Sequence, residues 1–144
     1  MARQDRRWGG SPTPERHVIA ASFFESFTPR EVARISAAGT RVRLPEGWSP
    51  VWESTPADKA YIILSGEVAV RRGGTEIARL GAGDIMGETA IVNHTLRTAT
   101  LVALSPLELI HLTDDAVRRL CEQLPSFKRA LDEVVLAREV ASSD

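Results

Sequence analysis

Cysteine is almost absent from this sequence, which limits the chemistry open to the protein. The single cysteine, Cys121, cannot form an internal disulfide, so nothing in the composition indicates an oxidising compartment. Cys121 falls in a helical apolar pattern and is expected to be a small buried side chain. No paired base accompanies it or any serine, so the sequence does not indicate nucleophilic catalysis.

Histidine is scarce too. The three histidines, His17, His94 and His111, lie far apart and lack ligand spacing, so they predict no metal site. A metal-dependent enzyme on a β-barrel, the weakest alternative considered, needs several histidines and carboxylates around one ion. We therefore expect a protein that is not an enzyme and that holds no metal and no resident cofactor.

Long apolar runs are also missing. No run approaches the roughly 18 residues that a membrane span requires, and the arginines near the N-terminus are not followed by the apolar stretch of a signal peptide. The sequence thus predicts a cytoplasmic protein without a membrane partner. The formal net charge of -1 gives no electrostatic reason to expect nucleic acid as a partner.

The residues that are present suffice for one hydrophobic core. A chain of 144 residues, 43% of them hydrophobic and 26% charged, has the composition of a single globular domain. Residues 1–14 combine a basic start with a run of glycine, serine and proline, which predicts a flexible N-terminal arm. Residues 15–144 are predicted to form the domain.

Helical patterns flank the centre of the chain. Apolar residues between His17 and Phe27 predict a short buried helix, and residues 28–31 predict a capping box that starts a second helix, which ends at Gly39. A third helix is expected after the cap Thr113, and Pro125 is expected to open a last one.

The last helix has one apolar stripe in its pattern. The stripe is formed by Phe127, Leu131, Val134 and Val135. The charged residues are predicted to face elsewhere; they are Lys128, Arg129, Asp132, Glu133 and Arg138.

Between the helices, short apolar or alternating runs are separated by turn residues. The runs cover residues 41–44, 49–53, 60–64, 67–71, 76–80, 97–104 and 107–112. Such spacing predicts a mainly β fold with flanking helices, in the form of an antiparallel β-barrel or sandwich. Residues 71–75 predict a tight hairpin around two glycines. Trp48 and Trp52, four residues apart around Pro50, are expected to pack in the core or at its rim.

Residues 87–98 carry the strongest indication of function. Gly87 permits a ligand to approach the backbone closely, and a short helix after it would offer free N–H groups to a phosphate. Arg97 could close on the phosphate oxygens with its planar donors. Glu88 accepts hydrogen bonds only, so it needs a neutral donor such as a sugar hydroxyl. The loop therefore predicts a site for a sugar phosphate.

In this order, the motifs resemble those of the cyclic-nucleotide-binding domain family. The motifs are Gly47 in the first turn, residues 60–68 (AYIILSGEV), residues 83–88 (GDIMGE) and residues 97–100 (RTAT). The resemblance covers about Val18 to Arg138. It implies a jelly roll, also called a double-stranded β-helix, with N-terminal helices and C-terminal lid helices.

The resemblance also implies roles in ligand binding. Arg97 would neutralise the cyclic phosphate, and Glu88 would accept a hydrogen bond from the ribose 2'-hydroxyl. The backbones of Gly87 and Ala90 would complete the cradle, and the hydroxyl of Thr98 would reach the phosphate or a guanine amino group. The nine-residue offset from Glu88 to Arg97 matches the compact form of this phosphate-binding cassette.

Four positions depart from the family pattern. Met86 replaces a common aromatic residue, and Thr89, which we include among the ligand-binding residues, replaces an apolar one. Leu96 replaces the usual proline before the arginine, which restores conformational freedom to the loop and is expected to weaken affinity. Thr55 replaces a frequent glycine, with no evident effect on the site.

The leading hypothesis is a sensor that binds cyclic AMP or cyclic GMP reversibly without changing it. No helix-turn-helix, kinase or channel segment follows, so the signal is expected to pass to a protein partner or through a homodimer formed by the C-terminal helix. One alternative is a domain of this fold that has lost its ligand and serves as an interaction module. In that case Glu88 and Arg97 could form an internal ion pair that only pins the loop.

Overall fold

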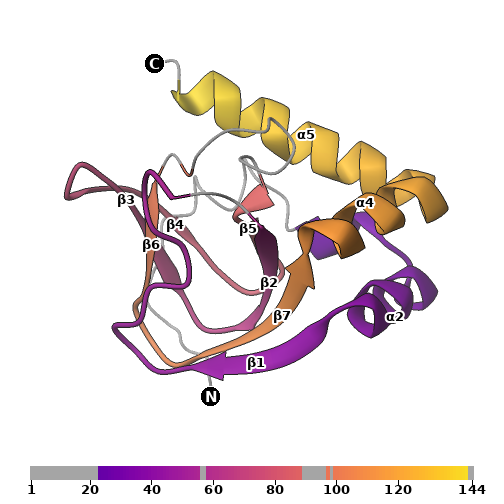
Figure 1. Ribbon diagram of the computed structural model, residues 1–144, viewed down its shortest axis with the longest axis horizontal. Helices are drawn as coiled ribbons and strands as arrows, with labels where there is room; N and C mark the ends of the chain where they lie inside the picture. The colour runs from indigo at the N-terminus through magenta and orange to yellow at the C-terminus, as the bar shows by residue number, and fades with distance from the viewer. Residues whose placement is uncertain (1–22, 56–57, 89–96, 98, 143–144) are drawn as a thin grey trace.

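The computed structural model describes residues 23–55, 58–88, 97 and 99–142 (Figure 1). The elements are η1 (Phe23–Ser26), α2 (Pro29–Ala38), β1 (Thr40–Leu44), β2 (Lys59–Ser65), β3 (Val68–Arg72), β4 (Thr75–Leu80), β5 (Ile85–Met86), β6 (Thr100–Ala103), β7 (Leu107–Thr113), α4 (Asp114–Gln123) and α5 (Pro125–Ser142). The predicted arm and the site residues Thr89, Ala90 and Thr98 lie outside the described residues.

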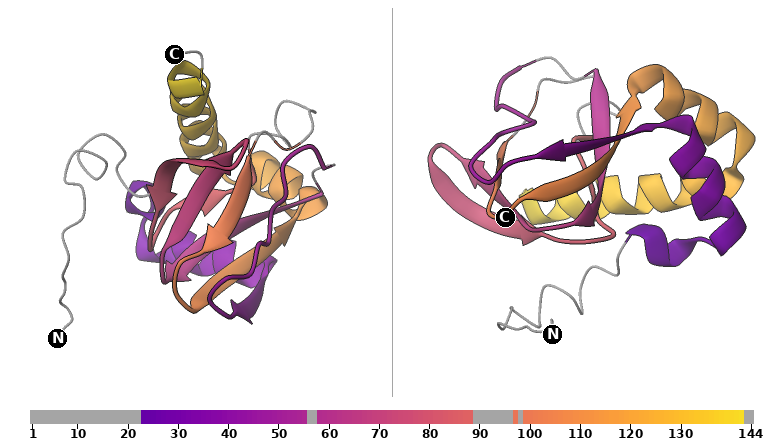
Figure 2. Two further views of the ribbon diagram at one scale, coloured as in Figure 1. Left: turned by 90° about the vertical axis from the view of Figure 1, so that its left-hand side faces the viewer. Right: turned by 90° about the horizontal axis from the view of Figure 1, so that it is seen from below.

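The strands form two antiparallel sheets with helices beside them, which confirms the predicted fold class. One sheet has the order β1-β7-β2-β5 and the other has the order β4-β3-β6. Within the described ranges, the hydrogen bonds do not close the two sheets into a barrel, so the arrangement is a jelly roll of two separate sheets. The helices gather at one end of the strands, and α5 lies above β5 in Figure 1. In the right-hand view of Figure 2, α2 and α4 lie at one side of the strands and α5 runs behind them.

The structure corrects the predicted strands at two places. The run 49–53 forms no strand but a single bridge between Val51 and Leu101, because Pro50 lacks an N–H and interrupts the ladder. Trp48 and Trp52 flank this bridge with 60% and 58% of their surface exposed, so neither belongs to the core. The short strand β5 was not predicted.

The predicted hairpin is confirmed. Gly73 and Gly74 turn the chain from β3 into β4 with φ values of 58° and 83°, which glycine adopts without steric cost.

Strand β2 is buried on both faces, which explains its continuous apolar sequence. Ala60 and Ile62 face a core shared with the helices, while Tyr61 and Ile63 face a second core between the two sheets. Phe127, which is 0% exposed, belongs to the first core. The domain thus has two hydrophobic layers with β2 between them.

Aromatic rings join the N-terminal segment to α5. The described part of the segment predicted as a buried helix is the 3-10 turn η1. The rings of Phe23 and Phe27 lie 5.6 Å and 6.2 Å from the ring of Phe127, measured between centroids. These contacts fix the first turn of α5 against η1.

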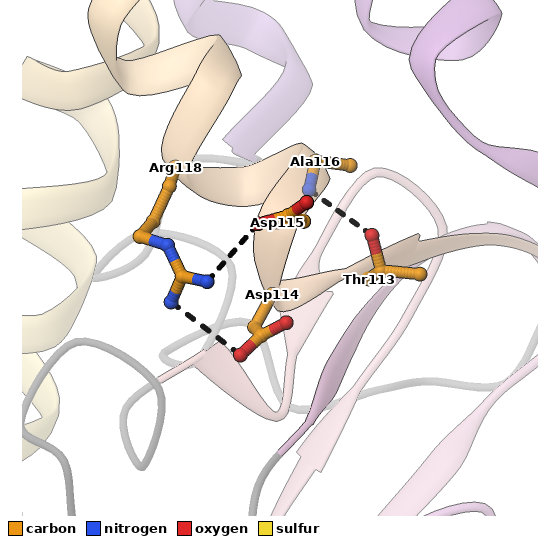
Figure 3. A network of polar contacts seen from close by, with 5 residues as sticks. All are labelled: Thr113, Asp114, Asp115, Ala116 and Arg118. Atoms are coloured by element: carbon orange, nitrogen blue, oxygen red, sulfur yellow. Dashed lines mark hydrogen bonds and ion pairs between the residues drawn. The ribbon is translucent and has the colours of Figure 1, made fainter.

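The predicted start of α4 is confirmed. Thr113 Oγ1 accepts a hydrogen bond from the Ala116 N–H at 3.0 Å, and Arg118 forms ion pairs with Asp114 and Asp115, as Figure 3 shows. The two carboxylates lie at the positive end of the helix dipole, which they stabilise. Leu124 ends α4, and α5 opens at Pro125 as expected.

The capping box of α2 also joins this helix to α5. Glu31 accepts hydrogen bonds from the Thr28 N–H at 2.9 Å and from the Ser126 hydroxyl at 2.6 Å. The Ser126 contact, followed by the Thr28 contact, holds the pKa of Glu31 below its ordinary value of 4.5.

This shift gives a prediction for acid stability. A carboxylate whose pKa is lowered by folding stabilises the fold above its unfolded pKa, and the contribution disappears as the pH falls below 4.5 through the folded value. Chemical denaturation between about pH 5 and pH 3 should therefore show a smaller loss of stability in Glu31→Gln than in the original protein. Glu46→Gln, at an exposed turn residue, is the control and should behave as the original protein does. Identical acid sensitivity of Glu31→Gln would contradict the prediction.

Among the described residues, no helix is long and apolar enough to cross a membrane.

Candidate functional site

Three of the six predicted site residues are described, and the structure brings them together beside β5. Gly87 and Glu88 follow this strand directly, and Arg97 returns to the same place from the far end of the loop. Gly87 has a φ of 83°, a conformation that favours glycine. A Cβ atom at Gly87 would lie 2.8 Å from Arg97 Nη1 and 3.3 Å from the Lys59 carbonyl oxygen. The missing side chain therefore makes room for the guanidinium.

The guanidinium of Arg97 is held by backbone carbonyls. Its Nη1 donates to the Gly87 oxygen, and its Nη2 donates to the Lys59 oxygen at 2.7 Å. Arg97 is only 5% exposed. These two bonds connect the end of β5 to the beginning of β2 through one side chain.

Burial and nearby charges shift the pKa of Arg97 in opposite directions. Removal from water lowers its pKa, while the charges of Asp58, Tyr61 and Glu88 oppose that shift. Arginine remains protonated in proteins even when its pKa is lowered. The site therefore contains a largely dehydrated positive charge, which attracts an anion more strongly than an exposed charge does.

Tyr61 lies close enough to Arg97 for the two groups to interact electrostatically. Its pKa is raised by burial, an effect that the Arg97 charge opposes. The Tyr61 ring lies 5.5 Å from the His111 ring, and burial followed by the Lys59 charge lowers the pKa of His111. Burial thus disfavours the charged form of both the Tyr61 phenol and the His111 imidazole.

Glu88 is wholly buried and pairs with the last helix. Arg138 Nη1 lies 2.6 Å from each carboxylate oxygen of Glu88. Glu88 is 0% exposed, whereas the Arg138 side chain is 32% exposed. The prediction that Arg138 faces away from the apolar stripe was therefore wrong.

Helical spacing could have revealed Arg138. It follows Leu131 by seven residues and Val134 by four, so it continues the apolar stripe that places α5 against the domain. An arginine at the end of such a stripe needs a buried acceptor, and Glu88 supplies one. Glu88 therefore forms an ion pair with Arg138, and its charge also acts on Arg97.

The site combines a buried cation, a buried carboxylate and a glycine, whose backbone no side chain covers. These groups can recognise an anion that also carries hydroxyls. Among the described residues, no cluster of histidine, cysteine, aspartate and glutamate could hold a metal ion. The pKa of Cys121, the one thiol, is raised by burial.

Gly87 offers a stability test with a matched control. Gly87→Ala should lower the free energy of unfolding by about 2 kcal/mol, because the substitution adds left-handed strain and displaces Arg97. Gly47→Ala carries similar strain at a φ of 90°, but nothing lies within 4 Å of the added atom. Urea denaturation should therefore show the larger loss for Gly87→Ala, and equal losses would mean that the Arg97 contact is unimportant.

Comparison with known proteins gives one family. The sequence model described as "Cyclic nucleotide-binding domain" matches residues 41–124. The chain is 32% identical over 106 residues to a cAMP-dependent protein kinase regulatory subunit of Hypocrea atroviridis, and 26% identical over 102 residues to the cGMP-dependent protein kinase egl-4 of Caenorhabditis briggsae. The fold is similar to that of the Thermus thermophilus catabolite activator protein, with a TM-score of 0.74 and 28% identity.

These similarities cover most of this chain but only part of each relative. The kinase relatives match 74% and 71% of this chain, which corresponds to 23% and 14% of their own lengths. The catabolite activator protein matches 85% of this chain and 59% of its own. The similarity therefore concerns the domain rather than the whole of each relative.

Proposed function

Because the chain belongs to the cyclic nucleotide-binding domain family, we propose that it binds cyclic AMP or cyclic GMP reversibly and does not change it chemically. The observation that carries this proposal is that a buried guanidinium, Arg97, and a buried carboxylate, Glu88, both lie next to Gly87. A cyclic nucleotide has one phosphate charge and one free ribose hydroxyl, which correspond to these two groups. The names of the two kinase relatives, one cAMP-dependent and one cGMP-dependent, support both nucleotides as candidates.

The cyclic phosphate binds at Arg97 in this proposal. A guanidinium has five N–H donors, so it can keep its bonds to Gly87 and Lys59 and still donate to a phosphate oxygen. The low exposure of Arg97 strengthens this contact relative to one in water. Thr89, Ala90 and Thr98 remain predicted members of the same cradle.

The ribose 2'-hydroxyl donates to Glu88. A carboxylate offers about four lone-pair positions, so Glu88 can bind Arg138 and a hydroxyl together. Ligand binding would thereby alter the contact that holds the end of α5. Such a ligand favours one position of α5 only if its affinity differs between the two positions.

A change at α5 would be transmitted to a protein partner or to a second copy of the chain. Leu136, on α5, is 62% exposed and offers an apolar contact for either. The Hypocrea relative is itself named as a regulatory subunit, which supports a regulatory role.

Calorimetric titration tests the proposal directly. Cyclic AMP and cyclic GMP should each be titrated, with 5'-AMP as a control that keeps the base and ribose but opens the phosphate ring. Saturable heat with a cyclic nucleotide, and weaker binding of 5'-AMP, is the expected result. Absence of heat with both cyclic nucleotides would overturn the proposal in favour of the ligand-independent interaction module. This second function is supported by the contacts that Arg97 and Glu88 already make within the protein, because such contacts can stabilise the loop without a ligand.

A further inference from the structure

The main chain of Arg97 is bonded to one turn of the protein. The Arg97 N–H donates to the Thr55 carbonyl oxygen, and the Ser54 N–H donates to the Arg97 carbonyl oxygen, both at 2.8 Å. The turn runs from Trp52 to Thr55 and precedes β2. The position of the Arg97 backbone therefore depends on a segment more than forty residues away in the sequence.

The turn has an uncommon backbone conformation. Ser54 has a φ of 68° and is the one positive-φ residue other than glycine among the described residues. The Thr55 hydroxyl donates to the Trp52 carbonyl oxygen at 2.6 Å and closes the turn. A non-glycine residue in this region costs free energy, so surrounding contacts must hold it there.

Glu53 supplies two of those contacts. Its N–H donates to Thr100 Oγ1 at 2.9 Å, which ties the turn to β6. Its carboxylate accepts from the Gly73 N–H at 3.1 Å, which ties the turn to the hairpin between β3 and β4. The turn is thus anchored at two places in the three-stranded sheet and bonded to Arg97.

We propose that the turn Trp52–Thr55, anchored by Glu53 and Thr100, positions Arg97 for the phosphate of the cyclic nucleotide. This inference rests on the proposed function and adds residues outside the cassette to it. Glu53 and Thr100 are positioning residues, since they act through the backbone of Arg97. The Thr55 carbonyl is a partner of the Arg97 N–H, and a glycine at this position could make the same bond.

Variants of Glu53 distinguish the effect of its hydrogen bond to Gly73 from the effect of its negative charge. Glu53→Ala removes the acceptor for Gly73, whereas Glu53→Gln removes the charge and keeps an acceptor oxygen. We expect Glu53→Ala to weaken binding of the preferred cyclic nucleotide by about fivefold to tenfold, and Glu53→Gln to bind nearly as the original protein does. Thr100→Val, which removes the acceptor for the Glu53 N–H, should resemble Glu53→Ala, and Thr100→Ser should restore binding.

Two further measurements distinguish positioning from a general loss of stability. The first is the ratio of affinities for the two phosphorothioate diastereomers of the nucleotide, which differ only in the phosphate oxygen replaced by sulfur. A fixed guanidinium discriminates between them, so the ratio should move towards one in Glu53→Ala. The second is hydrogen exchange of the Arg97 amide without nucleotide, which should accelerate in Glu53→Ala and Thr100→Val.

The outcomes separate the two proposals. If the original protein binds no cyclic nucleotide, the proposed function fails, while faster exchange of the Arg97 amide in the variants still supports the positioning role. If nucleotide binds but affinity, diastereomer ratio and Arg97 exchange all stay unchanged in Glu53→Ala and Thr100→Val, the positioning role is overturned. An equal loss in Glu53→Gln and Glu53→Ala would overturn it too, since charge would then be the cause.

Discussion

Replacing Arg97 by alanine is expected to weaken cyclic nucleotide binding by about a hundredfold or more. Two charge-assisted hydrogen bonds to the phosphate, at about 1.5 kcal/mol or more each, correspond to a change of that size. Burial strengthens the effect, because Arg97 is 5% exposed and water cannot replace its donors freely. Calorimetry on the original and variant proteins measures the ratio, and far-UV circular dichroism checks that the variant is folded.

Two other substitutions serve as controls for this result. Arg97→Lys keeps a positive charge but loses the planar donors and the bonds to two carbonyls, so its affinity should fall between those of the original protein and Arg97→Ala. Arg43→Ala removes a guanidinium from an 86% exposed side chain on β1 and should leave binding unchanged. Undiminished binding by Arg97→Ala would place the site elsewhere in the molecule.

Most of the fold could be predicted from local patterns. The hairpin at Gly73 and Gly74, the capping box of α2 and the cap at Thr113 each follow from residues close together in the sequence. Strand β5 could not be predicted in this way, because two residues are too few to show a period of two. The segment 49–53 has apolar residues but makes one bridge only, so its composition alone was misleading.

The sequence indicated side chains of the candidate site but not the contacts that they make. Motif order indicated Gly87, Glu88 and Arg97, and the structure brings these three together. The acceptors of the guanidinium are backbone carbonyls, which every residue has, so no residue type marks Lys59 as a partner. Arg138 is different, since its place on the apolar stripe of α5 is visible in the sequence once the stripe is extended by one turn.

Breaking the ion pair between Glu88 and Arg138 is expected to lower the stability of the fold substantially. Arg138→Met keeps most of the apolar stem but removes the guanidinium that lies 2.6 Å from the buried carboxylate. Removing one member of a buried pair typically costs about 3–5 kcal/mol. Because the Arg138 side chain is 32% exposed, water can reach the carboxylate after the substitution, and we expect a loss of about 2–3 kcal/mol in the free energy of unfolding.

A double-mutant cycle shows whether this loss comes from the pair itself. Glu88→Gln removes the buried charge, so Arg138→Met should cost much less on that background than in the original protein. The coupling free energy measured by urea denaturation is expected to be about 1.5 kcal/mol or more. Independent effects of the two substitutions would contradict the pairing as a source of stability. A large coupling would identify Glu88 as the carboxylate that holds the end of α5. Under the proposed function the same carboxylate accepts from the ribose, so occupancy of the site and the position of the helix would be linked.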